Sequence, residues 1–198
     1  RDAIFTHLTA CARHVAALTA RTGLDLHLGL EPEPLCQLET SEETVAFFEE
    51  WRAGTPAARE FGQVVGVNYD CCHLAVEFEE PAAALARLAA AGIRLSKLHL
   101  SSALRVRPDA AGRAALAAFV EPTYLHQVVA AERGIVRHRF ADLPDALTAA
   151  EAQPPGADTE WRIHFHVPLH AAPAAPLGDT RDHLLGTLDW LAAPPASC

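Results

Sequence analysis

The sequence predicts an α/β fold that forms part of a (β/α)₈ barrel. Apolar segments of strand length alternate with amphipathic segments of helix length, an order that gives parallel strands covered by helices. No glycine-rich phosphate-binding loop follows a predicted strand, so the usual signature of an open nucleotide-binding sheet is absent. Polar residues instead collect where several strands end, as in barrel active sites. We therefore expect a single domain over residues 1–198.

The first half of the chain contains repeated strand and helix signals. Residues 2–22 have apolar side chains at helical spacing and end at Gly23, and residues 24–30 show the period of a strand. Thr40 and Glu43 form a capping box, which predicts a helix over 41–52. Further elements are expected at 56–62 (a helical turn), 64–69 (a strand), 81–91 (a helix that stops at Gly92) and 94–100 (a strand). The expected apolar stripe of the first helix is Ile4, Leu8, Cys11, Val15 and Leu18.

The second half departs from this alternation. After a helix at 109–119, two strand-like segments flank Ala-Glu-Arg-Gly, which predicts a β-hairpin insertion near 123–140 with Gly134 in its turn. A helix at 142–150, a strand at 161–168, a proline-rich loop at 171–177 and a helix at 181–191, capped by Asp179 or Thr180, are expected next. The chain opens inside a helix without methionine and stops soon after its last helix. We therefore expect the C-terminal part of a barrel whose first strands and last strand are missing.

The charge, the apolar runs and the cysteine spacing of the chain argue against several classes of function. The formal net charge is −9 and the cations are scattered, which argues against a nucleic-acid partner because phosphate binding needs clustered cations. No apolar run reaches the roughly 18 residues that a membrane span needs. The five cysteines lack the paired spacing of a disulfide framework or a zinc finger and indicate reduced thiols of a cytoplasmic protein.

The strand expected at 64–67 lies at the centre of the predicted site. It has the character of a buried parallel strand, so Asp70 and His73 are expected in the loop at its carboxyl end, where α/β proteins place their chemistry. A mixed carboxylate and imidazole set suits Zn²⁺, Mn²⁺, Co²⁺ or Fe²⁺, and Mg²⁺ also accepts its carboxylates. The other candidate ligands at predicted strands are Glu31 or Glu33, His99, His126, His164 and His166.

Structural roles compete with ligand roles at several of these positions. An aspartate at a strand end can cap the next helix or turn, so Asp70 has two interpretations. One of His164 and His166 could serve only as a hydrogen-bonding residue, and His126 lies in a hairpin that could be peripheral. We expect buried small residues at Cys71 and Cys72, and a solvated helix entry at Glu77, Glu79 and Glu80.

Several stretches resemble the xylose-isomerase-like barrel superfamily, which contains sugar-phosphate isomerases, epimerases and nucleases of the endonuclease-IV type. Within it, the chain is most similar to the EboE family of metabolite traffic proteins of the Ebo operon. The resemblance spans residues 30–170 and is carried by Leu-Glu-Pro-Glu-Pro (30–34), Tyr-Asp-Cys-Cys-His (69–73), Cys-His-Leu-Ala-Val-Glu-Phe-Glu-Glu-Pro (72–81), Leu-His-Leu-Ser-Ser (98–102), Ser-Ser-Ala-Leu-Arg-Val (101–106), Tyr-Leu-His-Gln-Val (124–128) and His-Phe-His-Val-Pro-Leu (164–169).

The resemblance implies a divalent metal ion bound by Glu31, Asp70, His73 and His99, with Glu33 as a competitor of Glu31. It also implies catalytic roles for Glu31 and His73, and additional metal or substrate contacts by Glu33, His126, His164 or His166. The second glutamate that the superfamily carries on its last strand has no match in this chain.

The resemblance favours a protein that binds a sugar-like or polyol-like metabolite, with isomerase or epimerase chemistry if it is an enzyme. The alternative is a non-catalytic protein that binds a metabolite and hands it over for export. A metal-dependent phosphodiesterase of the endonuclease-IV type ranks third, because the charge of −9 offers no basic surface for DNA.

Overall fold

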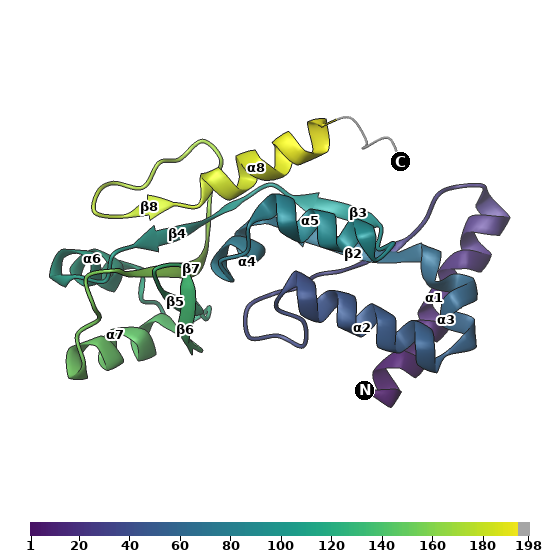
Figure 1. The fold of residues 1–198 in the computed structure, drawn as a ribbon, viewed down its shortest axis with the longest axis horizontal. Helices are drawn as coiled ribbons and strands as arrows, with labels where there is room; N and C mark the ends of the chain where they lie inside the picture. The colour runs from purple at the N-terminus through teal and green to yellow at the C-terminus, as the bar shows by residue number, and fades with distance from the viewer. Residues whose placement is uncertain (194–198) are drawn as a thin grey trace.

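The computed structural model describes residues 1–193 as a mixed α/β protein with two sheets placed along its long axis (Figure 1). Sheet A is parallel, in the order β1-β2-β3, and sheet B is antiparallel, in the order β6-β5-β7-β4-β8. Sheet A consists of β1 (Leu28–Leu30), β2 (Val65–Asp70) and β3 (Leu95–His99). Sheet B consists of β4 (Ser102–Val106), β5 (Val128–Glu132), β6 (Ile135–Phe140), β7 (Thr159–Val167) and β8 (Gly178–Asp179).

The expected helices are present. Gly23 ends the first helix in the left-handed conformation, with φ at 70°, and the Thr40–Glu43 capping box opens the second. Within the described residues, none of the helices combines the length and the apolar character needed to cross a membrane. The α-helices are α1 (Asp2–Thr22), α2 (Ser41–Gly54), α3 (Pro56–Phe61), α4 (Cys71–Val76), α5 (Pro81–Ala90), α6 (Ala110–Leu116), α7 (Leu143–Ala152) and α8 (Arg181–Ala192), with 3₁₀ turns η1 (Gly62–Val64) and η2 (Ala117–Phe119).

The prediction of an α/β fold is confirmed, but residues 1–193 form no closed barrel. Two strands, β4 and β8, were not predicted, and β7 lies in the antiparallel sheet instead of continuing the parallel one. The physical reason is the short connection after β3. The chain leaves sheet A at His99 and enters β4 at Ser102, which leaves no length for the helix that a parallel crossover needs.

The predictions for the first helix and for the hairpin need correction. The buried side of α1 consists of Phe5, Leu8, Thr9 and Ala12, whereas Ile4 and Cys11 are exposed. The hairpin exists, but its first strand begins at Val128, and its two-residue turn uses positive φ at both Arg133 (51°) and Gly134 (79°). Positive φ at both positions is the requirement of the primed turns that match strand twist.

The described residues bury two separate hydrophobic cores. One packs α1, α2 and α5 against sheet A and includes Trp51 and Leu85, and the other packs α6 and α7 against sheet B and includes Leu143 and Trp161. A small third cluster, which includes Cys72, joins α4 to β4 and β5. The short helix α4 therefore lies at the junction of the two sheets.

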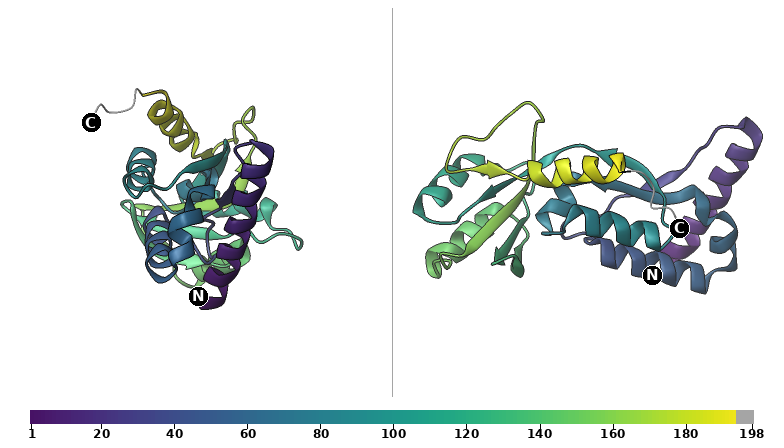
Figure 2. Two further views of the ribbon diagram at one scale, coloured as in Figure 1. Left: turned by 90° about the vertical axis from the view of Figure 1, so that its right-hand side faces the viewer. Right: turned by 45° about the horizontal axis from the view of Figure 1, so that its top comes forward.

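Helix α8 is held to sheet A through a buried histidine. It runs beside α5 (Figure 2). His183 Nδ1 lies 3.1 Å from the backbone oxygen of Glu79, which can only accept, so Nδ1 carries the proton and Nε2 accepts from the hydroxyl of Tyr69 at 2.9 Å. Burial is the main cause that lowers the pKa of His183 from 6.5 to about 4.

This buried imidazole predicts a loss of stability in acid. Because the pKa of His183 is lower in the folded state, its contribution is complete above pH 6.5 and is lost as the pH falls toward about 4. The loss amounts to about 3 kcal/mol. We expect His183→Gln to have a lower free energy of unfolding than the parent at pH 7. At pH 4 the two free energies, both measured with urea, should be nearly equal. Parallel pH profiles of the two proteins would contradict this assignment.

Candidate metal centre

The carboxyl ends of the three parallel strands bring together Glu31, Asp70 and His99, which we call the carboxylate group. Nδ1 of His99 lies 2.9 Å from Oε1 of Glu31 and 3.1 Å from Oδ2 of Asp70. Metal bonds of about 2.1 Å at angles between 90° and 109° separate neighbouring ligand atoms by about 3.0–3.4 Å. The observed separations are therefore close to those around one divalent cation, although an Nδ1 proton shared with the carboxylates also accounts for them.

Asp70 divides its two oxygens between structure and site. Oδ1 caps α4 by accepting from the backbone N–H of Cys72 at 2.7 Å and of His73 at 3.3 Å, and it also accepts from the hydroxyl of Ser101. Oδ2 faces His99. The two interpretations of this aspartate, as a cap and as a ligand, are thus compatible. The loop expected after β2 is absent, because α4 begins at Cys71 and places His73 in its first turn.

Sequence reasoning missed Asn68, which completes this group. Its Nδ2 donates to Oε2 of Glu31 at 2.7 Å, and its Oδ1 is buried without a hydrogen-bond partner in the described structure. Asn68 precedes Asp70 by two residues on β2, so the two side chains share one face of the strand. This alternation along the strand is the sequence signal that could have identified Asn68 as part of the site. The amide fixes the orientation of the glutamate carboxylate.

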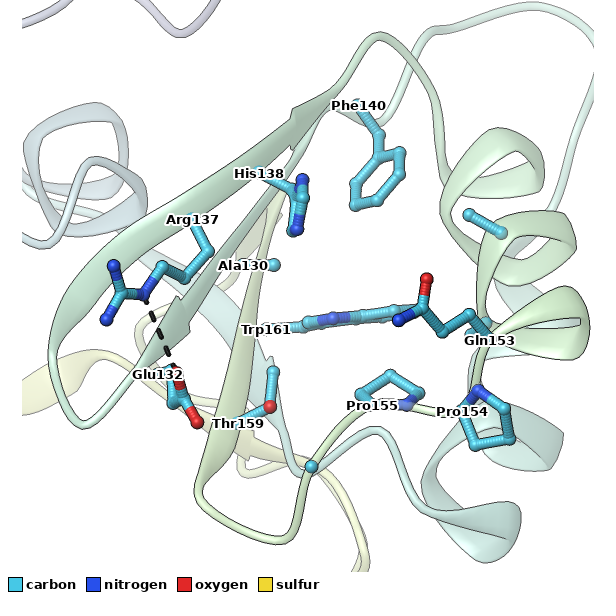
Figure 3. A pocket seen from close by; sticks show the side chains of 13 residues that line it. Ala130, Glu132, Arg137, His138, Phe140, Gln153, Pro154, Pro155, Thr159 and Trp161 are labelled. Carbon is cyan, nitrogen blue, oxygen red and sulfur yellow. Dashed lines mark ion pairs between the residues drawn. The ribbon is translucent and has the colours of Figure 1, made fainter.

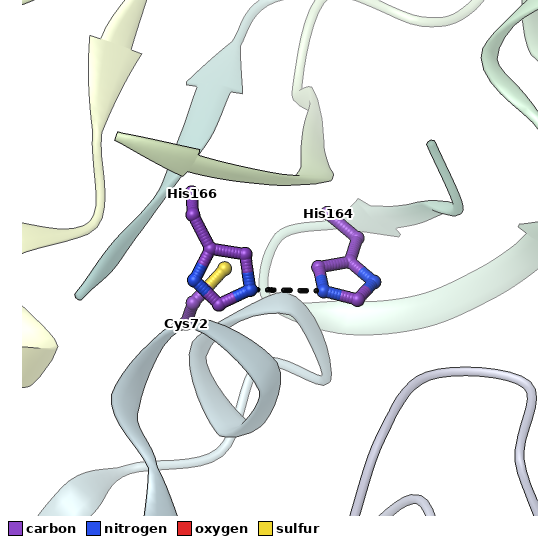
Figure 4. Close-up of side chains that lie close together, drawn as sticks. All are labelled: Cys72, His164 and His166. Carbon is purple, nitrogen blue, oxygen red and sulfur yellow. Dashed lines mark hydrogen bonds between the residues drawn. The ribbon is translucent and has the colours of Figure 1, made fainter. Parts of the chain in front are cut away.

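A second set of donors adjoins the first and consists of His73, His164 and His166, which we call the imidazole group. The ring of His73 lies 4.6 Å from that of His164 and 5.3 Å from that of His166, between centroids. Nε2 of His164 and Nε2 of His166 are 3.2 Å apart. Figure 4 shows both rings extending from β7 toward α4, where Cys72 lies.

The hydrogen bonds of His73 and His164 fix which ring nitrogen carries the proton, and Nε2 of His164 accepts from Nε2 of His166. Nδ1 of His73 donates to the backbone oxygen of Pro32 at 3.0 Å, and Nδ1 of His164 donates to Oε1 of Gln127 at 2.8 Å. Since each acceptor is a carbonyl oxygen, the proton sits on Nδ1 and Nε2 is unprotonated in both rings. This is the arrangement that second-sphere carbonyls impose on metal-binding histidines.

Burial keeps the imidazoles of His164 and His166 neutral. It is the main cause that lowers the pKa of His164 to about 3 and also lowers that of His166. Neutral imidazole is the form that binds a cation. Burial raises the pKa of the Cys72 thiol well above its usual value, so without a cation this side chain is a thiol and not a thiolate.

Asp70 links the carboxylate group to the imidazole group. Ligand atoms of Asp70, His73 and His166 lie within 4.8 Å of one another, as do those of Glu31, Asp70 and His99. Two further sets at the same separation are Glu33, His73 and His164, and Cys72, His164 and His166. The structure thus brings together every candidate ligand of the sequence analysis except His126.

His126 supports the site from outside these sets. Its Nδ1 donates to the backbone oxygen of His164 at 3.2 Å, and its backbone N–H donates to Oδ1 of Asp142. The first bond ties the segment before β5 to β7, beside Gln127, which holds the ring of His164, and the second ties it to the start of α7. A supporting position explains why a histidine occurs there without joining a ligand set.

No protein-family model, no curated protein and no solved structure gives a match to this chain. Membership of the xylose-isomerase-like superfamily is therefore a proposal, made below together with the function.

A cavity of about 390 Å³ lies between β6 and α7, away from these donors (Figure 3). Its lining includes Trp161, Phe140 and His138. Trp161 belongs to the face of β7 opposite to His164 and His166, because neighbouring residues of a strand point to opposite faces. Sheet B therefore separates this cavity from the candidate metal centre.

Proposed function

We propose that the protein is an EboE-like member of the xylose-isomerase-like superfamily that binds divalent cations and a small sugar-like or polyol-like metabolite. In this proposal sheet A and its helices are part of a (β/α)₈ barrel. The observation that carries it is the convergence of two donor groups on Asp70, with unprotonated Nε2 atoms on His73 and His164. The donor set suits Zn²⁺, Mn²⁺ or Co²⁺, and Mg²⁺ at the carboxylate group.

Asp70 and Glu31 differ in solvent exposure, and this difference suggests different roles for the two carboxylates. The Asp70 side chain is 1% exposed and accepts from three protein donors, whereas the Glu31 side chain is 32% exposed. A bound cation would polarise a substrate carbonyl. We assign proton transfer next to that carbonyl to Glu31, whose Oε2 is oriented by Asn68, and substrate contact to His73.

The imidazole group favours a second candidate function. A second cation beside the first is the arrangement of enzymes that hydrolyse phosphate esters, in which two metals hold the attacking and leaving oxygens. The charge of −9 favours a small phosphoester over DNA as the substrate. We also propose a cytoplasmic location, because the four cysteines among residues 1–193 are free thiols.

Solvent exchange tests the proposed chemistry. We expect the protein loaded with Mn²⁺ or Co²⁺ to incorporate deuterium from D₂O next to the carbonyl of one member of a ketose panel, detected by proton NMR. Glu31→Gln should abolish the exchange because an amide cannot accept the proton, and Glu49→Gln, on exposed surface of α2, is the matched control.

The other outcomes of this experiment decide between the alternatives. Saturable metabolite binding without exchange across the panel would replace isomerase chemistry by a handover role. Hydrolysis of a small phosphodiester to a phosphomonoester and an alcohol would support the second candidate.

A further inference from the structure

One face of β7 packs against the short helix α4. Arg162, His164 and His166 alternate along the strand and share this face, which lies against α4. Nη1 of Arg162 donates to the backbone oxygen of Ala75 at 2.7 Å. The imidazoles of His164 and His166 meet His73 on the same helix. Arg162 and His164 are two residues apart on β7, and so are their contacts on α4, Ala75 and His73.

The guanidinium of Arg162 also holds the end of α4. Its central carbon lies 4.0 Å from the centre of the Phe78 ring, a cation–π contact. Phe78 has a positive φ of 60°, a conformation that costs free energy in a bulky residue and persists only where its surroundings fix it. Nε of Arg162 donates to Glu160 at 2.8 Å, which fixes the guanidinium plane.

A second arginine anchors the same helix end from β6. Nη2 of Arg139 lies 2.6 Å from Oε2 of Glu77, whose side chain is fully buried and whose other oxygen has no partner in the described structure. Burial is the main cause that raises the pKa of Glu77. The expectation that Glu77 is a solvated residue is therefore wrong. Glu79 is also largely buried and accepts from the backbone N–H of Ser41, while Glu80 is exposed and caps α5.

We infer that Arg162 is a positioning residue, which sets the register of α4 against β7 and thereby assembles the imidazole group. The inference rests on the proposed cation binding. It follows from the placement of the imidazole group on two elements: His73 belongs to α4, whereas His164 and His166 belong to β7 of sheet B. The three members of the carboxylate group all lie at the end of sheet A and do not depend on this register.

Co²⁺ titration tests the inference. The parent is the full chain carrying His99→Ala, which removes the nitrogen donor of the carboxylate group and leaves the imidazole group to be titrated. In this background Arg162→Met keeps an apolar stem over Phe78 but loses the bond to Ala75. We expect Co²⁺ binding at least about tenfold weaker, the usual cost of losing a second-sphere contact.

Two further variants separate positioning from general stability. Arg107 also donates to a backbone oxygen, that of Ala157 at 2.8 Å, but away from α4, so Arg107→Met should leave the Co²⁺ affinity within about twofold of the parent. Arg162→Lys should recover part of the affinity, since an ammonium can reach the oxygen of Ala75 but lacks the planar contact with Phe78. In the chain with His99 intact, Arg162→Met should weaken only one of two Co²⁺ sites.

The experiment distinguishes a failure of the proposed cation binding from a failure of the positioning role of Arg162. A His99→Ala parent without Co²⁺ absorption bands would show that the imidazole group binds no cation, which overturns this part of the proposed function. A parent that binds Co²⁺, with Arg162→Met and Arg162→Lys binding equally well, would overturn the positioning role alone. If Arg162→Met does not fold, by far-ultraviolet circular dichroism, the ranking of parent, Arg162→Lys and Arg107→Met decides the inference.

Discussion

Replacing Asp70 by asparagine is expected to weaken cation binding at both donor groups. Asp70 belongs to the carboxylate group and to the set that includes His73 and His166, so it is the residue through which the two groups adjoin. An amide keeps an oxygen to cap α4 but presents no charge to the cation. Loss of a second-sphere partner weakens metal binding by up to about 100-fold. Because Asp70 is itself a candidate ligand, we expect the Zn²⁺ and Co²⁺ affinities to fall by at least about 100-fold.

A matched aspartate controls for the capping role. Asp109 caps α6 by accepting from the backbone N–H of Gly112 at 2.8 Å. Asp109→Asn should keep the metal content of the parent when both are measured by inductively coupled plasma mass spectrometry after dialysis. The combined Asp70→Ala and His99→Ala variant should be metal-free. Unchanged metal occupancy in that variant would falsify the site.

Replacing Gly66 by alanine is expected to destabilise sheet A by about 3 kcal/mol, at the upper end for overpacking. A Cβ atom at Gly66 would collide with the backbone oxygen of Arg94 and lie 2.6 Å from Oγ of Ser96. The oxygen of Arg94 cannot move away cheaply, since it accepts from the backbone N–H of Val67 at 2.9 Å and belongs to the connection that leads into β3.

The same substitution should also disturb the candidate metal centre. The collision pushes β3 away from β2, and these strands carry His99 and Asp70 in paired positions. We expect a lower urea midpoint together with weaker Co²⁺ binding. Gly54→Ala is the control, because a Cβ at the end of α2 meets no atom within 4 Å, and it should keep or raise the midpoint. A Gly66→Ala protein with the midpoint of the parent would show that the two strands can separate without cost.

Local signals were sufficient for most of the helices. The capping box of Thr40 and Glu43 and the left-handed Gly23 act within a few residues, so the sequence predicts these boundaries without knowledge of the fold. The hairpin turn at Gly134 is equally local. The partner of a strand is not a local property, and here prediction failed: β4 was missed and β7 was assigned to the wrong kind of sheet.

The residues of the candidate site also fall into those that the sequence could place together and those that only tertiary packing brings together. Glu31, Asp70 and His99 could be placed together from sequence, because the carboxyl ends of parallel strands meet at one edge of a sheet. His164 and His166 were candidates for a different reason, as members of a presumed barrel strand. They reach His73 because sheet B packs against α4, a contact between segments almost one hundred residues apart that no local pattern encodes.

The sequence by itself determined which side chains stand at the strand ends: carboxylates and imidazoles, with a capping aspartate after an apolar strand. Tertiary structure alone decided that these side chains form two adjoining groups, that Asn68 and Gln127 orient them, and that Glu77 is buried against Arg139. The reason is that periodicity tells which face of an element a side chain occupies, whereas the packing of two separate cores decides what that face meets.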